Sequence, residues 1–503
     1  MTSDRRGSAR EAIASLTDDF TELPTPPREY APDGPLAWQG YDATRARAAE
    51  RTGEEESVVW GRATIGTSPA VPGVSAVLIS FEFGFLGGSL GERTGDRLEA
   101  AHTYARAHRL PVVSLVATGG SRMQEGMRAL AQLQRVARES ALTRAAGLPQ
   151  IAVLRDPTTG GGWATLGAGA DITLALPTAQ VGFAGSRVRP PDADPTAYTA
   201  ESQLAAGSID AVIPPTALRD TLTRYLTLLT APSTAPAPPP HAFPQPEKHG
   251  AQPLLLRGAG LYSSAAPPRG AASHDAPAAA TPQNPPPHEA PLPLTGWEAV
   301  QRARSPQRPH AETYLDTYFT RRASLQGDRA GGTDPGMLCG FGEHEGRAIA
   351  YAAQCGTPTR PAGYRTAARL IRLADRLGIP VLTLIDTPGA ANDAEAERQG
   401  AGPAIADLFT AVATARTPLT TLLIGEGGSG GALALAAPGN TWATPDSYFS
   451  VIAPEPAAAI LKRPAHQAPA TADELRVRPQ DLVELGVVRG ITEPAPPLPD
   501  PPG

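Results

Sequence analysis

The stretch PLTTLLIGEGGSGGALALAA, residues 418–437, decides the fold of this chain. An apolar run of strand type ends there at a glycine-rich turn, and small apolar residues follow as in a helix. The first half has the same order at 110–140, where LPVVSLVAT ends at Gly119 and Gly120 and apolar residues then recur at helical spacing. Strand, glycine turn and helix, found in both halves, predict stacked βαβ units around core sheets. We therefore expect an α/β protein with two related halves.

Composition divides the chain into four parts. Residues 1–55 are polar, with the proline-rich stretch TELPTPPREY, and we expect an extension that wraps on the surface or is partly disordered. Residues 56–231 and 296–495 carry the apolar patterns of two globular domains. Between them, residues 232–295 are dominated by Pro and Ala, which is typical of a semi-rigid linker.

Charge and cysteine content exclude several classes of protein. The 503 residues carry a net charge of -6, whereas a nucleic-acid-binding protein normally shows a basic face. The chain has 2 cysteines, so a four-thiolate zinc site is impossible, and we expect no metal. No apolar run reaches the roughly 18 residues of a membrane span, and the N-terminus lacks the apolar core of a signal peptide. We expect a soluble, cytoplasmic protein.

Glycine pairs at strand-to-helix turns favour binding of an oxyanion. Without a Cβ, the backbone N–H groups can approach a ligand, and the helix N-terminus adds unpaired donors and partial positive charge. Such a turn stabilises a developing negative charge without any charged side chain. A tight turn that only packs a helix closely on a sheet is the structural alternative, and it stays open for each pair taken alone.

Two other motifs overlap the stretch at 418–437. Gly427-x-Ser429-x-Gly431 fits a nucleophile elbow, with Asp446 and His466 downstream in the order of a hydrolase triad, so a serine hydrolase using Ser429 is an alternative function. Gly425-x-Gly427-x-x-Gly430 has the spacing of a dinucleotide fingerprint, but no clear strand precedes the acid that should follow it. No GxxxxGK[ST] phosphate loop is present.

Several long motifs in order carry a resemblance to a known family. The first half resembles the β subunit of bacterial acetyl-CoA carboxylase carboxyltransferase, and the second half resembles the α subunit; β followed by α resembles the fused form. The motifs are FEFGFLGGSLGERTG (81–95), ATGGSRMQEG (117–126), DPTTGGGWAT (156–165), VGFAGSRV (181–188), GYRTAARLIRLADRLGIPVLTLIDTPGA (363–390), IGEGGSGGALA (424–434) and YFSVIAPE (448–455).

The resemblance implies two crotonase-like domains of ββα repeats, joined by the Pro/Ala-rich linker. It implies an enzyme that moves CO2 from carboxybiotin to acetyl-CoA or propionyl-CoA, giving malonyl-CoA or methylmalonyl-CoA, as in fatty acid biosynthesis. Biotin would be carried on a separate carrier protein and charged by a separate biotin carboxylase, because neither a biotin-attachment lysine between two methionines nor an ATP-binding loop is present. In relatives the two halves face each other across an interface, so we expect an even-numbered homo-oligomer.

The resemblance also assigns site residues. Gly119 and Gly120 would hold the thioester enolate oxygen, and the biotin ureido oxygen would be held by a pair among Gly427, Gly428, Gly430 and Gly431. The remaining acyl-CoA candidates are Gly87, Gly88, Arg122, Gly160, Gly161, Phe183, Ala184, Gly185 and Arg187, with Arg122 preferred as a phosphate contact. The remaining biotin-side candidates are Gly389, Ala390, Ser429 and Ala432, and Tyr364 is either structural or on the biotin side.

The sequence departs from the family at several points. The zinc-ribbon cysteines that usually begin the β subunit are missing, so no metal-linked role is carried over. After DTPGA the segment ANDAEAERQG differs from the family, which leaves the acyl-CoA substrate open. Two further hypotheses remain: a decarboxylase of a malonyl thioester with the same fold, and a non-catalytic paralogue that scaffolds a carboxylase.

Overall fold

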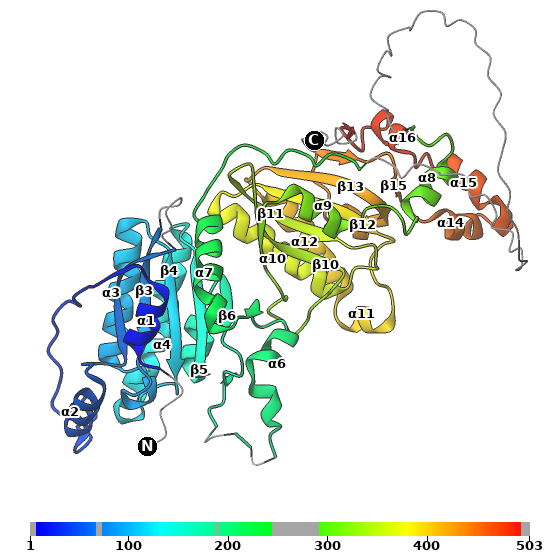
Figure 1. Cartoon of the computed structure of the whole chain (residues 1–503). Coiled ribbons are helices and arrows are strands. Elements are labelled where there is room, and N and C mark those ends of the chain that lie inside the picture. Colours follow the sequence, from blue (N-terminus) through cyan, green and yellow to red (C-terminus); the bar gives the residue numbers. More distant parts are fainter. Residues whose placement is uncertain (1–6, 67–72, 187–188, 191, 244–290, 494–503) are drawn as a thin grey trace, which may run out of the picture.

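Each half of the protein is built around one eight-stranded sheet (Figure 1). The computed structural model describes residues 7–66, 73–186, 189–190, 192–243 and 291–493. The prediction of an α/β protein with two related halves is confirmed.

The first sheet has the order β1-β2-β3-β4-β5-β6-β8, with β7 paired to the end of β5. The pairs β1–β2 and β2–β3 are antiparallel and the others are parallel. The strands are β1 (Asp19–Glu22), β2 (Val58–Ile65), β3 (Val74–Phe81), β4 (Val112–Thr118), β5 (Gln150–Thr159), β6 (Ile172–Ala175), β7 (Val181–Gly182) and β8 (Ala211–Val212).

The second sheet repeats this plan in the order β9-β10-β11-β12-β13-β14-β16, with β15 paired to the end of β13. The parallel ladder shifts register at the same place in both sheets, between Val116 and Thr118 in β4 and between Ile385 and Thr387 in β12. The strands are β9 (Arg321–Ser324), β10 (Met337–His344), β11 (Arg347–Gln354), β12 (Val381–Thr387), β13 (Leu419–Gly428), β14 (Thr441–Ala443), β15 (Tyr448–Ser450) and β16 (Gly490–Ile491).

Helices cover the sheets in corresponding places, with α3 packed on α4 in the first half and α10 packed on α12 in the second. The helices of the first half are α1 (Ala9–Leu16), α2 (Tyr41–Thr52), α3 (Glu92–His108), α4 (Gly126–Ala145), α5 (Gly160–Gly162), α6 (Ala200–Ala205) and α7 (Pro215–Leu229). Those of the second are α8 (Gly296–Ala303), α9 (Ala311–Tyr318), α10 (Pro361–Leu377), α11 (Ala394–Arg398), α12 (Ala401–Thr414), α13 (Ser429–Leu433), α14 (Pro454–Ile460), α15 (Ala468–Glu474) and α16 (Pro479–Glu484).

Helix α10 shows how the local sequence sets these elements. Pro361 stands at its first turn, where no intrahelical N–H is needed, and Gly378 ends it in the left-handed region at φ +67°. Small and aliphatic residues between them bury one side of the helix against its own sheet and α12, which explains why the segment is helical and where it lies.

The two halves of one chain share a core. Helix α7 of the first half contributes Leu222 and Leu226 to an apolar cluster that continues into Phe341 and Leu370 of the second half. Buried Asp210 of the first half accepts hydrogen bonds from Arg329 at 2.6 Å and from Arg369 at 3.1 Å. The apolar cluster and this charged cluster join the halves directly.

The extension at 1–55 and the start of the linker are more ordered than the sequence suggests. In the described part of the extension, α1 buries Ala9, Ile13 and Leu16 in the shared core, and β1 adds an edge strand to the first sheet. At 233–243 the chain packs on the second half, where Thr420 donates to the carbonyl of Ala237 at 2.7 Å. The rest of the predicted linker, 244–290, lies outside the described residues.

No helix in the described part of the chain is long and apolar enough to cross a membrane. Among the same residues, no group of three or more His, Cys, Asp or Glu side chains lies together as metal ligands would.

Candidate functional site

The strands β4 and β12 end in the same backbone turn. Thr118 and Thr387 occupy equivalent last positions, and the hydroxyl of each accepts the N–H of a glycine two residues on, Gly120 at 3.0 Å and Gly389 at 3.1 Å. Both glycines have positive φ, +110° and +139°, which disfavours any residue with a Cβ. The turn is thus fixed by one threonine and one glycine in each half.

The N–H groups that remain unpaired at these turns belong to the next residues, Ser121 and Ala390. Ser121 forms an isolated parallel bridge with Leu90, and Ala390 forms one with Thr359. The hydrogen bonds of each bridge are made by the chain neighbours of Ser121 and Ala390, not by these two residues themselves. Among the described residues, neither N–H has an acceptor. The predicted donors Gly119 and Gly120 are both engaged, Gly119 with the carbonyl of Gly87 at 2.8 Å.

A second pair of equivalent turns follows β5 and β13. Gly160 and Ser429 stand at the same position with φ of +62° and +56°, and α5 and α13 begin there. The next N–H groups, those of Gly161 and Gly430, lie in the first turn of a helix and therefore have no acceptor within it. Each half thus offers one unpaired N–H at the strand turn and another at the helix start.

The two turns of each half touch. A Cβ built on Gly160 would lie 3.1 Å from the Cα of Gly120, and one on Gly431 would lie 2.4 Å from the N of Ala390. Because both turns are this close, the unpaired N–H groups can serve one ligand oxygen together, and the positive end of a short helix adds to the same field. This geometry suits an oxyanion in both halves.

Arg122, the preferred phosphate contact, has a different environment from the one expected. Its side chain is 1% exposed and its guanidinium donates to Glu56 at 3.0 Å, to the hydroxyl of Tyr41 at 3.2 Å and to the carbonyl of Ser89 at 2.7 Å. Burial opposes ionisation of Glu56, but Arg122 outweighs it and lowers the pKa of Glu56 to about 2. Arg122 therefore braces the turn from inside and does not face a ligand. Its partners come from distant segments, which the sequence around it does not reveal.

The other candidates of the first half gather around its turns with separate tasks. A Cβ on Gly88 would lie 2.1 Å from the carbonyl of Ala117, so Gly88 permits close packing. Phe183 accepts the N–H of Gly160 through its carbonyl at 3.1 Å, and its side chain is 73% exposed. A Cβ built on Gly185 would contact Thr159. The carbonyl of Ala184 accepts a hydrogen bond from Arg189 at 3.2 Å. Arg187 lies outside the described residues.

The candidates of the second half divide in the same way. Gly427 and Gly428 are paired with β15, and a Cβ on Gly428 would lie 2.0 Å from the Pro388 carbonyl, so they belong to the strand. Gly430 is exposed, and no atom lies within 4 Å of the place where its Cβ would stand. The structure brings Gly389, Ala390, Ser429, Gly431 and Ala432 together around this open position.

The constellation of a serine hydrolase is not assembled. Within the described part of the chain, the Ser429 hydroxyl makes no hydrogen bond with a histidine, and His466 makes no side-chain hydrogen bond. Asp446 lies 3.7 Å from Arg302 in an ion pair. Ser429 has a left-handed backbone conformation because it stands at the turn position that Gly160 occupies in the first half.

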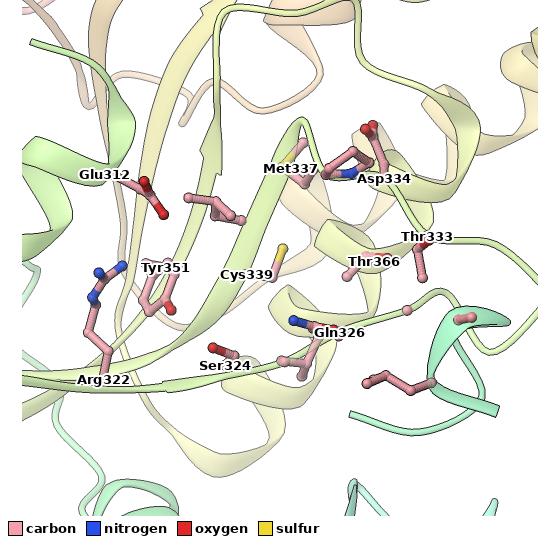
Figure 2. A pocket seen from close by; sticks show the side chains of 16 residues that line it. Glu312, Arg322, Ser324, Gln326, Thr333, Asp334, Met337, Cys339, Tyr351 and Thr366 are labelled. Carbon is pink, nitrogen blue, oxygen red and sulfur yellow. The ribbon is translucent and has the colours of Figure 1, made fainter. Parts of the chain in front are cut away.

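A cavity of about 820 Å³ lies at the seam between the halves, away from the glycine turns (Figure 2). Figure 2 shows Glu312, Arg322 and Tyr351 on one side of it and Thr333 and Asp334 on the other. Leu204 and Ala205 of α6 complete the lining from the first half. Because none of the turn residues lines this space, the candidate site is placed by the backbone donors and not by the cavity.

Large apolar side chains are exposed on the segments that follow the turns in both halves. In the first half they lie on α4 and just before it and at the end of β7, and in the second they lie on α13, after β15 and at the end of α14. The residues are Met123, Met127, Leu130 and Phe183, and Leu433, Val451, Ile460 and Leu461. Phe183 and Val451, at equivalent positions after β7 and β15, are both 73% exposed.

Comparison with known families gives two matches, one in each half of the chain. Residues 37–231 match the model described as "Carboxyl transferase domain", and residues 288–496 match "Acetyl co-enzyme A carboxylase carboxyltransferase-like". The acetyl-coenzyme A carboxylase carboxyl transferase subunits beta/alpha of Salinispora arenicola are 37% identical over 513 residues, covering 98% of this chain and 83% of that protein. The alpha subunit from Deinococcus radiodurans is 41% identical over 222 residues, covering 42% of this chain and 68% of that subunit.

Among solved structures, transcarboxylase 12S superposes with a TM-score of 0.71 at 19% identity, covering 97% of this chain and 87% of that one. That structure is described as a hexamer with hydrolysed methylmalonyl-coenzyme A bound. At this identity the likeness establishes the fold, which is the crotonase-like fold of carboxyltransferases.

Proposed function

The chain belongs to the carboxyltransferase family of acetyl-CoA carboxylase, and from that membership we propose that it carboxylates a short acyl-CoA, with biotin on a separate carrier protein as the carboxyl donor. One observation carries the assignment of the sites. Each half presents the same pair of unpaired backbone N–H groups, Ser121 with Gly161 and Ala390 with Gly430. The reaction needs two oxyanions to be stabilised, and the chain offers two such pairs.

In the first half, the N–H groups of Ser121 and Gly161 hold the thioester oxygen of the acyl-CoA. When the α-carbon loses its proton, the C–H electron pair moves toward this oxygen and an enolate forms. The two donors stabilise that charge, and removing one such donor typically costs about 2.7–4 kcal/mol of barrier. The enolate carbon then forms the new C–C bond with the CO2 that carboxybiotin would release when its N–C bond breaks.

In the second half, the N–H groups of Ala390 and Gly430 fit the ureido oxygen of biotin. The space beside Gly430 is open, as a flat ring on a carrier arm requires, and Ser429 lies exposed next to it. Biotin supplies the carboxyl group when it is bound. The protein's own contribution is to favour negative charge on the ureido oxygen, which makes that group a base for the acyl-CoA α-proton.

The family supports acetyl-CoA as the substrate, with propionyl-CoA second, and malonyl-CoA or methylmalonyl-CoA as the product. A biotin carboxyl carrier protein and a biotin carboxylase are the partners that this reaction requires. Purified chain alone should therefore not fix bicarbonate with ATP, and transfer should appear when carboxylated carrier is added.

The exposed apolar residues on the segments that follow the two pairs of turns support assembly of two copies in opposite orientation. Exposed large apolar side chains are often buried where two protein surfaces meet. A C2 pair would place the first-half turns of one copy against the second-half turns of its partner, and would bury Met127 and Phe183 as well as Val451 and Ile460. Each active site would then need two chains.

Mixing two inactive variants tests this arrangement. Gly120→Val should inactivate the acyl-CoA turn and Gly431→Val the biotin turn, so each variant alone should not transfer. If the sites lie between copies, a mixed dimer regains one intact site, and activity should return to about a quarter of wild type after equal mixing and exchange of subunits. No recovery, with exchange shown by mass, would contradict the shared site. Release of labelled CO2 from a malonyl thioester without any carrier would instead favour a decarboxylase.

A further inference from the structure

The carbonyl of Gly431, in the helix turn of the second half, has a side-chain support that the equivalent Gly162 carbonyl lacks among the described residues. The carbonyl of Gly431 accepts a hydrogen bond from the hydroxyl of Tyr364 at 3.1 Å and another from Nε2 of Gln354 at 3.3 Å. Both side chains are fully buried. Neither can touch a ligand, so any effect they have on the reaction must pass through the turn.

The same side chains connect the turn to its neighbour after β12. Gln354 Nε2 also donates to Oγ1 of Thr359 at 3.1 Å. The backbone of Thr359 brackets Ala390, since its N–H donates to the Gly389 carbonyl at 3.1 Å and its own carbonyl accepts from Ala391 at 2.9 Å. Gln354 thereby links the peptide that carries one donor of the pair to the helix that carries the other.

The equivalent positions of the first half hold no hydrogen-bonding side chains. Phe81 ends β3 where Gln354 ends β11, and Leu90 forms the bridge that Thr359 forms. Gly95 is the fourth residue of α3, as Tyr364 is the fourth of α10. The polar support is therefore a property of the biotin side and not of the duplicated fold.

Helix length explains why the second half needs this support. In the first half, a π-helix at Trp163–Gly167 follows α5, so backbone N–H groups continue beyond Gly162, the counterpart of Gly431. Helix α13 ends at Leu433, and the N–H of Leu435 bonds to the Ala432 carbonyl at 3.2 Å. The Gly431 carbonyl is left out of the helical ladder and takes its donors from Tyr364 and Gln354.

The support has an energetic cost that packing alone does not explain. Gln354 Oε1 is buried and has no hydrogen-bond partner among the described residues. A buried acceptor without a partner is destabilising, and an apolar residue such as the Phe81 of the first half would avoid this cost.

We propose that Tyr364 and Gln354 are positioning residues of the biotin turn, which hold the Gly431 carbonyl so that the N–H groups of Gly430 and Ala390 point at one ureido oxygen. This rests on the proposed function of the second half. The two side chains set the approach to biotin and leave the acyl-CoA turn unaffected.

Kinetics of the reverse reaction, with malonyl-CoA as donor and biocytin as acceptor, test the proposal. Tyr364→Phe and Gln354→Leu should each lower kcat/KM for biocytin roughly tenfold, the usual weight of one hydrogen bond. Because they share one acceptor, the double variant should lose less than the product of the two. The KM for malonyl-CoA should stay within about twofold of wild type.

A readout without catalysis is amide hydrogen exchange measured on the full chain. Both variants should exchange faster than wild type in the segment 424–436 and unchanged in the equivalent segment 156–167. Tyr318→Phe is the matched control: it removes a buried hydroxyl of the same half that donates to the Pro238 carbonyl at 2.8 Å, away from the turns. It should lower the unfolding temperature without changing either readout.

Three outcomes would overturn the inference: unchanged exchange at 424–436, unchanged kinetics for biocytin, or an equal loss of kcat/KM for biocytin and for malonyl-CoA that comes from a raised KM of both. A wild-type chain that transfers no carboxyl group would contradict the proposed function itself, whereas active wild type with unaffected variants would contradict only the positioning role. If one variant does not fold, the other carries the same test.

Discussion

The two halves reach the same donor geometry by different means. In both, a threonine at a strand end, a glycine with positive φ and a short helix leave one N–H unpaired on each of two adjoining turns. Behind the turns, the first half places Phe81 and Leu90, and the second places Gln354 and Thr359. The comparison teaches that the backbone path creates the donors and that the surrounding side chains decide how firmly they are held.

The largest effect should come from filling the turns. Valine at Gly120 requires φ near +110°, and valine at Gly431 would put Cβ 2.4 Å from the N of Ala390. Each should reduce carboxyl transfer by at least about 100- to 1000-fold, as the loss of an oxyanion donor does. Gly120→Val should also raise the KM for acyl-CoA, whereas Gly431→Val should leave that KM within about twofold of wild type, as measured by steady-state kinetics.

Gly402→Val is the control for that pair, because no atom lies within 4 Å of the Cβ position of Gly402 in α12. Its transfer rate should match wild type. If both turn variants kept near-normal rates while folded, the glycines would only pack helices on sheets, and the assignment of both sites would fail.

The next largest effect should be a loss of stability when the ion pairs that join the two halves are removed. Asp210→Asn removes the carboxylate that the partly buried Arg329 and Arg369 share, and losing the buried member of such an ion pair costs about 3–5 kcal/mol. Urea unfolding should show this loss. The exposed Asp316, paired with Arg322, is the control, and Asp316→Asn should change stability by less than about 0.5 kcal/mol. Similar losses in the two variants would show that the seam contributes little.

A smaller effect should distinguish the two halves by how their stability depends on pH in acid. His102 of α3 stands where α10 has Ile371, and burial, together with nearby Arg106, lowers the pKa of His102 to about 4. The folded state therefore favours neutral His102. The contribution of neutral His102 to the free energy of unfolding is fully present above pH 6.5, the ordinary histidine pKa. That contribution falls as the pH drops toward 4, by up to about 3 kcal/mol.

Urea midpoints at pH 7.5 and pH 4.5 should measure that loss in wild type, and His102→Gln should flatten the slope. The variant also loses a hydrogen bond partner of Thr143, so its stability at pH 7.5 should be somewhat lower. An unchanged slope would mean that other groups set the acid response.

The smallest effect should follow from separating the halves. Residues 1–243 and 291–503, produced as two chains, share the apolar core of α7 and the pairs of Asp210, so they should associate when mixed. Transfer activity at micromolar concentration should be within about twofold of the intact chain, and gel filtration should show one complex. Chains that stay apart would show that covalent connection is required for assembly.

The sequence predicted the duplicated α/β architecture and the glycine turns because both depend on local patterns. It named Ala390 among the biotin-side residues but did not identify Ser121, its counterpart in the first half, since the pairing of Gly120 with Thr118 depends on how two strands shift register. The burial of Arg122 was not foreseen, because Glu56 and Tyr41 approach it only in the folded chain. A Thr two residues before a positive-φ glycine, present in both halves, was the available signal for the shared turn.

The burial of residues 9–16 escaped prediction for a similar reason. Ala9, Ile13 and Leu16 have helical spacing, but polar neighbours and a proline-rich stretch dominate the composition around them. Roles of individual residues toward acyl-CoA and biotin remain predictions that the variants above test.

Gly207 and Gly327 meet at the seam, backbone against backbone. A Cβ on Gly207 would lie 2.3 Å from the Gly332 carbonyl, and one on Gly327 would lie 2.2 Å from the Gly207 carbonyl, with both residues at positive φ. Because the contact is between backbone atoms, no side chain in one half could be made smaller to make room for a larger residue in the other. In evolutionary terms, neither glycine has a compensating substitution, so the two must be inherited together. A chimera that takes one half from a relative should assemble only when that relative also has glycine at its side of the contact.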